Sequence, residues 1–118
     1  MRTVTRIVLL AAALAAAAQA QELTGNAAKG KEWFFNYNCY SCHGFSGQNG
    51  PGNRLVPMKM SQAEFMAYVR KPARMPIYSA KVISDQQLAD IWAHIRSLPD
   101  APAAADIPLL QDIIKSSK

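Results

Sequence analysis

Cys39-Tyr40-Ser41-Cys42-His43 is the stretch that decides the fold of this 118-residue chain. It matches C-x-x-C-H, the pattern by which haem is attached covalently to a protein. Haem carries two vinyl groups on neighbouring pyrroles, and two thiols three positions apart can each add to one of them. His43 follows directly and is held beneath the iron, for which a neutral imidazole is a suitable ligand. The motif therefore predicts one covalent haem c, bound by Cys39 and Cys42 and ligated by His43.

Three other interpretations of the two cysteines explain the motif less completely. A thioredoxin-like redox pair belongs in a βαβ unit, and no strand-like pattern surrounds this motif. A structural zinc site needs four protein ligands, whereas the motif supplies three and the only other histidine, His94, lies far along the chain. A plain disulfide leaves the adjacent histidine unexplained. Haem attachment uses all three side chains.

The first twenty residues have the features of a secretory signal peptide. Arg2 and Arg6 form a positive segment, residues 7–18 are an apolar run, and Ala18-Gln19-Ala20 is a small-residue cleavage site. The run is shorter than the ~20 apolar residues of a spanning helix. We therefore expect a leader at residues 1–20, a periplasmic protein and no membrane span after cleavage.

Length and charge narrow the class further. The chain suits one small domain whose own apolar core is marginal, so a cofactor is a natural support. The formal net charge is +5, and without the two leader arginines 11 basic and 8 acidic residues remain. This mild excess suits acidic protein surfaces and is too weak and scattered for a nucleic-acid-binding protein.

Capping signals and apolar spacing predict an all-α domain at residues 21–98. A first helix covers residues 26–38, with Thr24 or Asn26 as its cap. Capping boxes at residues 61–64 and 84–87 open helices that end before Pro72 and Pro99. The last helix repeats apolar residues on one face. Residues 39–60 and 71–83, rich in glycine and proline, are expected to be loops.

This arrangement resembles the class I c-type cytochromes over nearly all of residues 25–99. The resemblance implies a small cytochrome c fold, with three main helices and loops wrapped around one haem. It implies that the first and last helices cross near Gly30, with Phe34 or Phe35 on one side and Trp92 on the other. Gly50-Pro51-Gly52 resembles the segment whose carbonyl accepts the second N–H of the proximal histidine, a role that falls on Pro51.

The sixth iron ligand has several candidates in the sequence. Met75 precedes Pro76, which forces an extended backbone that would hold the thioether out, and the pair resembles the methionine-proline ligand sequence of the family. Met58 and Met60 stay open as alternatives. Met66 is expected to pack in the core, and His94 is expected to be partly exposed on the flank of its helix.

Ligation by histidine and methionine fills both axial positions and raises the reduction potential. The expected function is therefore one-electron transport rather than catalysis. An alternative is the electron-accepting cytochrome subunit of a periplasmic dehydrogenase, an analogy at the level of fold. A haem peroxidase or a gas-binding cytochrome, with a labile sixth position, is the enzyme-class alternative.

Two further groups of side chains are assigned roles. Arg54, with Tyr68 and Tyr78, is expected to hydrogen-bond the haem propionates, because a guanidinium pairs well with carboxylates. A basic rim is expected to meet acidic redox partners, because no acidic residue lies between Glu64 and Asp85; its members are Arg70, Lys71, Arg74 and Lys81.

Residues 99–118 read as a linker-like tail that ends in a short apolar segment at residues 107–114. We expect this segment to fold back on the domain, with docking to a partner as the alternative.

Overall fold

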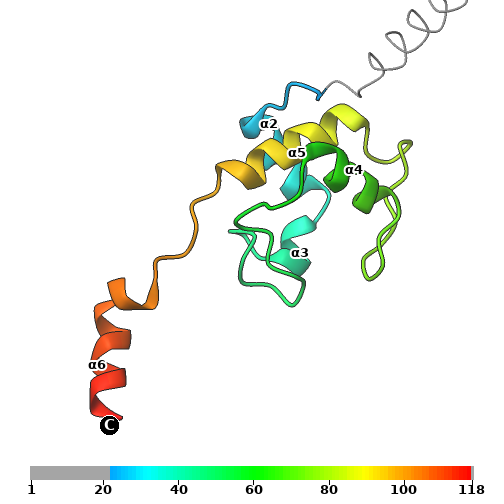
Figure 1. Cartoon of the computed structure of the whole chain (residues 1–118). Coiled ribbons are helices and arrows are strands. Elements are labelled where there is room, and N and C mark those ends of the chain that lie inside the picture. The colour runs from blue at the N-terminus through cyan, green and yellow to red at the C-terminus, as the bar shows by residue number, and fades with distance from the viewer. Residues whose placement is uncertain (1–21, 118) are drawn as a thin grey trace, which may run out of the picture.

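The computed structural model describes residues 22–117, and the expected leader lies outside the described residues. Within that range the chain is helical, with no strand (Figure 1). The all-α prediction is confirmed. The elements are α2 (Ala27–Asn36), α3 (Cys39–His43), α4 (Gln62–Arg70), α5 (Asp85–Ser97), the 3₁₀ turn η1 (Ala104–Asp106) and α6 (Pro108–Ser116).

Side-chain caps set where the helices begin. The Ser61 hydroxyl accepts from the Glu64 amide at 3.3 Å, and the Glu64 carboxylate accepts from the Ser61 amide at 2.8 Å. Ser84 and Gln87 make the same reciprocal pair at the start of α5. Such caps each contribute about 1 kcal/mol. The predicted starts of α4 and α5 are confirmed. They could be predicted because each capping box involves two residues only three positions apart.

The first helix is shorter than predicted, and a second helix follows it. Asn26 caps α2 by accepting from the Lys29 amide at 3.0 Å. The helix ends at Asn36, because Asn38 has a left-handed backbone with φ of 57°. The chain then turns into α3, in a stretch that the sequence predicted to be loop.

The domain is built on the crossing of α2 and α5. A Cβ on Gly30 would overlap the carbonyl oxygen of Asp90, so the two backbones approach as closely as glycine allows. The Asn26 amide also donates to the Asp90 carboxylate at 2.8 Å. The crossing at Gly30 appears as expected, but its partners on α5 are Asp90 and His94. Trp92 points elsewhere and donates to the carbonyl of Met60 at 3.0 Å.

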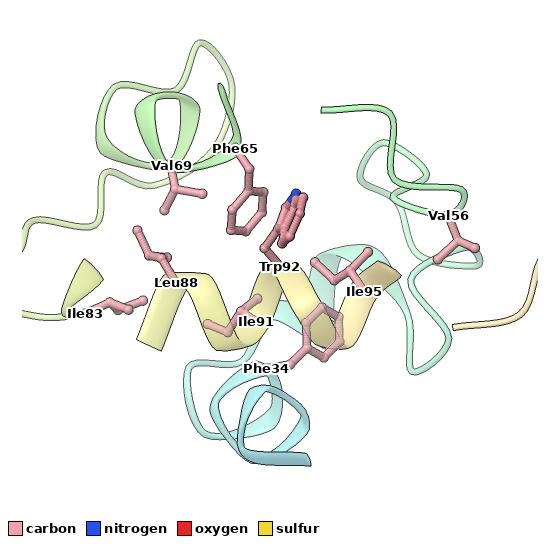
Figure 2. Close-up of a cluster of buried hydrophobic side chains, with 9 residues drawn as sticks. All are labelled: Phe34, Val56, Phe65, Val69, Ile83, Leu88, Ile91, Trp92 and Ile95. Carbon is pink, nitrogen blue, oxygen red and sulfur yellow. The ribbon is translucent and has the colours of Figure 1, made fainter. Parts of the chain in front are cut away.

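The core gathers around α5, between α2 and α4. In Figure 2, Leu88, Ile91 and Ile95 project from α5, and Phe34 reaches them from α2. Phe34 is fully buried, whereas Phe35 is half-buried. Burying each such side chain contributes about 1.5–3 kcal/mol. The cluster comprises Phe34, Val56, Phe65, Val69, Ile83, Leu88, Ile91, Trp92 and Ile95.

His94 is buried, with 5% of its surface exposed. The expectation of a partly exposed histidine was therefore wrong. Its Cβ sits over Gly30, where no side chain keeps α2 away, and its ring meets Phe34 edge to face at 5.6 Å. Its Nε2 has no hydrogen-bond partner. Burial lowers the pKa of His94, and the charge of Lys31 lowers it further.

This histidine predicts a loss of stability in acid. Because its pKa is lowered on folding, the unfolded chain binds the proton first as pH falls below about 6.5. The free energy of unfolding should then decrease, with a slope approaching about 1.4 kcal/mol per pH unit from this one proton. Denaturant unfolding of the wild type and of His94→Gln between pH 8 and pH 5, at about half-unit steps, measures it. Equal slopes in the two proteins would contradict the assignment.

The tail does not fold back on the domain. α6 stands apart from it (Figure 1), and the element that α6 contacts is η1. The expected folding back was wrong: α6 turns its apolar side chains to solvent instead of to the core. Leu109 is 69% exposed and Ile113 is 52% exposed. None of the helices in residues 22–117 is long and apolar enough to cross a bilayer.

Candidate haem site

A cavity of about 900 Å³ opens beside α3. Pockets that hold small ligands and cofactors span roughly 300–1,000 Å³, so this one is at the large end. The motif residues Cys39, Cys42 and His43 form one wall. Core side chains form a second wall, and most of the remaining lining comes from the loops 51–60 and 74–78. Most of the surroundings are apolar; the core residues that line the cavity are Phe34, Val56, Phe65, Val69, Ile83, Leu88, Ile91 and Ile95.

Local geometry turns the motif into one helical turn. The Ser41 hydroxyl donates to the carbonyl of Asn38 at 2.7 Å, and the turn ends at Gly44, whose φ is 75°. Positions i, i+3 and i+4 of a helix share one face. The spacing of Cys39, Cys42 and His43 therefore places all three side chains together on the cavity wall.

The two thiols are free. Cys39 is half-buried and Cys42 is exposed. Burial raises the pKa of Cys39 to about 11, and the neighbouring Cys42 adds to the rise. A dithiol redox pair instead needs a thiol whose pKa is lowered, and the raised pKa of Cys39 does not fit that role.

His43 is oriented by a backbone carbonyl, but not by the one expected. Its Nδ1 donates to the carbonyl of Asn53 at 2.7 Å. The assignment to Pro51 was wrong. A Cβ on Gly50 would overlap the carbonyl of Cys42, and the Gly52 amide donates to that carbonyl at 2.6 Å. This close packing brings the carbonyl two residues after Pro51 to the ring, and leaves Nε2 of His43 as the nitrogen free to ligate iron. Pro51 itself lines the cavity.

Three of the methionines line the cavity: Met58, Met60 and Met75. Met66 packs against the core, as its position within α4 indicated. Neither Met66 nor His94 is among the lining residues. The structure therefore narrows the candidates for the sixth ligand without choosing among the three.

The residues expected near the propionates also reach the cavity. Arg54, Tyr68 and Tyr78 line it. Burial raises the pKa of Tyr78, as do the two nearby cysteines, so its hydroxyl stays a donor.

Arg54 already has protein partners in this cavity. It donates to the carbonyl of Val56 at 2.6 Å and to Gln48 at 2.9 Å, and it forms an ion pair with Asp100. The sequence reasoning missed Asp100, because nothing local marks a residue 46 positions away as a partner of Arg54.

Comparison with known proteins supports the interpretation of this cavity as a haem site. Residues 25–95 match the family described as cytochrome c oxidase, cbb3-type, subunit III. The chain belongs to this family of cytochrome c domains. Membership accounts for the all-helical fold and gives the domain its class, haem-based electron transfer. The donor set fits the cofactor, because the cavity presents two unpaired thiols, one oriented imidazole and apolar walls.

Two curated relatives are similar to the same region. Both are named cytochrome bc1 complex cytochrome c subunit, from Corynebacterium diphtheriae and Corynebacterium efficiens. Each is 31% identical over 74 residues, which is 58% of this chain. The chain spans only 26% and 25% of the length of these relatives. No solved structure gives a significant match.

Proposed function

We propose that the chain is a one-electron carrier with one haem c, held covalently by Cys39 and Cys42 and ligated by His43 and Met75. The observation that carries this proposal is that all four side chains line one cavity of about 900 Å³. When bound, haem supplies an iron centre that changes by one electron. His43 and Met75 would then both be bound to the iron, which would leave no position for a substrate.

The chain's own residues orient and shield that centre. The Asn53 carbonyl fixes the tautomer and the direction of the His43 ring, which raises the basicity of the ligand. Pro76 disfavours a helical backbone at Met75, which would help to hold its thioether out toward the cavity. The core residues on the cavity wall would keep water away from a bound haem and so favour its less charged, reduced form. Tyr68, Tyr78 and a donor of Arg54 are proposed to receive the propionates.

The choice of Met75 is tested by removing its thioether. Met75→Ala should abolish the sulfur-to-iron charge-transfer band and lower the reduction potential, by on the order of 0.1 V. Met58→Ala, which truncates a second cavity methionine, is the control and should keep the band. If the band survives in Met75→Ala and is lost in the control, the ligand is Met58. Carbon monoxide binding to the wild-type protein would instead favour a labile sixth position and a gas-binding or peroxidase function.

Partners are proposed to dock on a basic surface near the cavity. Lys71, Arg74 and Lys81 are exposed, and Arg74 lines the cavity. In the described part of the chain, ion pairs join Arg54 to Asp100 and Arg70 to Asp85. The charge of Arg70 is thus balanced by Asp85, so Arg70 is not counted in the basic rim that the sequence predicted. The remaining cations suit an acidic partner, because redox encounters are small and are accelerated by charge.

This surface predicts a salt-dependent rate. Lys71→Glu combined with Arg74→Glu should slow electron transfer to an acidic redox protein by about tenfold at low salt. The difference should shrink as salt shortens the Debye length to ~10 Å at 0.1 M. Lys29→Glu with Lys31→Glu makes the same charge change on α2 and serves as the control. Stopped-flow rates against ionic strength measure the effect, and a flat profile for the wild type would refute steering.

A second candidate is a subunit of a larger oxidoreductase. It is favoured by the comparisons, since the family description and both relatives name subunits of respiratory complexes. On this proposal the domain works in the periplasm and passes electrons within an assembly, either a respiratory complex or a dehydrogenase. Co-purification of the tagged protein with a haem or quinol enzyme would support it, and isolation as a monomer that still turns over in respiration would contradict it.

A further inference from the structure

Two features of the tail are unexplained by the carrier function. The root of the tail is bonded to the loop beside the haem cavity, and its end is an amphipathic helix whose apolar side is not covered by any of residues 22–117.

The root is held by side chains from the cavity loop. Gln48 donates from Nε2 to the carbonyl of Pro99 at 2.9 Å, and Arg54 forms an ion pair with Asp100. Gln48 also accepts from Arg54 at 2.9 Å, so the two anchoring side chains support each other. Arg54 and Asp100 both line the cavity. The tail therefore leaves the domain at the edge of the haem site and not at a remote point.

The end of the tail is built to bury one face. Pro108 occupies the first turn of α6, where proline is favoured. Leu109, Leu110, Ile113 and Ile114 share one side of the helix and are 69%, 38%, 52% and 45% exposed. Lys115 lies on the opposite side. A helix of nine residues is marginal alone in water, and an apolar side of this kind gains stability only when something covers it.

Charge and size point to the kind of partner. Helices that bind anionic membrane surfaces are rich in Lys and Arg, whereas α6 carries Asp112 against Lys115. A second copy of α6 is a poor occupant, because a stable dimer needs ~800 Å² from each side, and four partly exposed side chains on a short helix offer much less. An uncharged apolar groove on a redox partner fits both constraints, because a transient redox encounter needs less area than a stable dimer, with the helix anchored by residues at i, i+1, i+4 and i+5.

We propose that α6 is a docking helix for an apolar groove on the redox partner protein, and that its anchored root holds that partner beside the haem cavity. This inference rests on the proposed carrier function. Seven residues lie between Asp100 and Pro108, and a fully extended chain spans at most about 3.6 Å per residue. Short linkers of this kind give effective concentrations in the millimolar range. Docking through α6 thus keeps the partner within reach of the cavity during repeated encounters.

The test uses the haem-loaded full chain and quinol-reduced respiratory membranes from the producing cells. Leu109→Asp with Ile113→Asp should lower the second-order rate of electron transfer from these membranes by about tenfold or more. Lys115→Asp makes the same change of two charge units on the opposite side, and it should react like the wild type. α6 contacts η1 and no element of the haem domain, so both proteins should keep the wild-type haem spectrum and reaction rate with ferricyanide.

Each other outcome overturns the inference. A wild-type membrane rate for the double variant means that α6 does not dock. Sedimentation that shows a wild-type dimer abolished by the double variant means that a second copy covers α6. Binding of the wild type to protein-free phosphatidylcholine–phosphatidylglycerol vesicles, lost in the double variant, means that lipid does. If the wild type itself fails to cycle with ferricyanide and ascorbate, it is the carrier function that fails.

Discussion

A chain in which Cys39 and Cys42 are both replaced with alanine is expected to lose haem completely on extraction with acidified acetone. The wild-type chain should keep its haem through the same treatment, because thioether bonds survive denaturation. The reason is the single turn of α3, which brings both thiols to one cavity wall. The measurement is the absorbance of the precipitated, redissolved protein in alkaline pyridine.

The matched control is Ser41→Ala, a substitution between the two cysteines. Ser41 is exposed and its hydroxyl donates to Asn38, so the variant should cost no more than about 1 kcal/mol and should keep the haem. Extractable haem in the wild type would refute covalent attachment. His43→Ala is expected to prevent a stable low-spin product even where the thioethers form.

Gly30→Ala is expected to destabilise the domain by about 2–3 kcal/mol or more, the upper range for overpacking. The new methyl group would overlap the Asp90 carbonyl on α5, which is backbone and cannot rotate away. For a domain of this size the midpoint of thermal unfolding should fall by about 10 °C or more. Circular dichroism of the two proteins measures it.

The direction of the stability change tells a close helix crossing at Gly30 from an ordinary exposed helix position. In an exposed helix the same substitution stabilises by about 1 kcal/mol, because alanine is the better helix former. Ala28→Gly, at an exposed position of α2, is the control for propensity and should cost about that amount. A more stable Gly30→Ala variant would mean that α2 and α5 do not approach each other at Gly30.

The sequence predicted those parts of the fold that are decided locally. The starts of α4 and α5 follow from capping boxes, whose two partners are three residues apart. The helix α3 was missed because five residues are too few for an apolar period. His94 was misplaced for another reason: a position on the flank of the stripe is buried here because the opposite helix presents Gly30, and only the crossing itself decides that.

In the candidate site, too, the features set by nearby residues were predicted and those set by distant contacts were not. The geometry of the C-x-x-C-H motif could be predicted, since helical spacing alone puts its three side chains on one face. The carbonyl that orients His43 depends on how residues 50–53 press against Cys42, so the sequence pointed to the right segment and the wrong residue. Asp100 and the exposed α6 depend on contacts made, or not made, across long separations, for which the sequence has no local signal.

The hydrogen bonds that join residues 24–26 to α5 have a consequence for where the folded unit begins. Gln86 donates to the carbonyl of Thr24 at 2.8 Å, and Asn26 donates to Asp90. Both bonds reach the first turns of α5, so residues 24–26 belong to the folded unit, and a chain shortened past them would leave the Asp90 carboxylate with Gln86 as its hydrogen-bond partner. A shortened or fused version of the domain should therefore keep the chain from Thr24 onward.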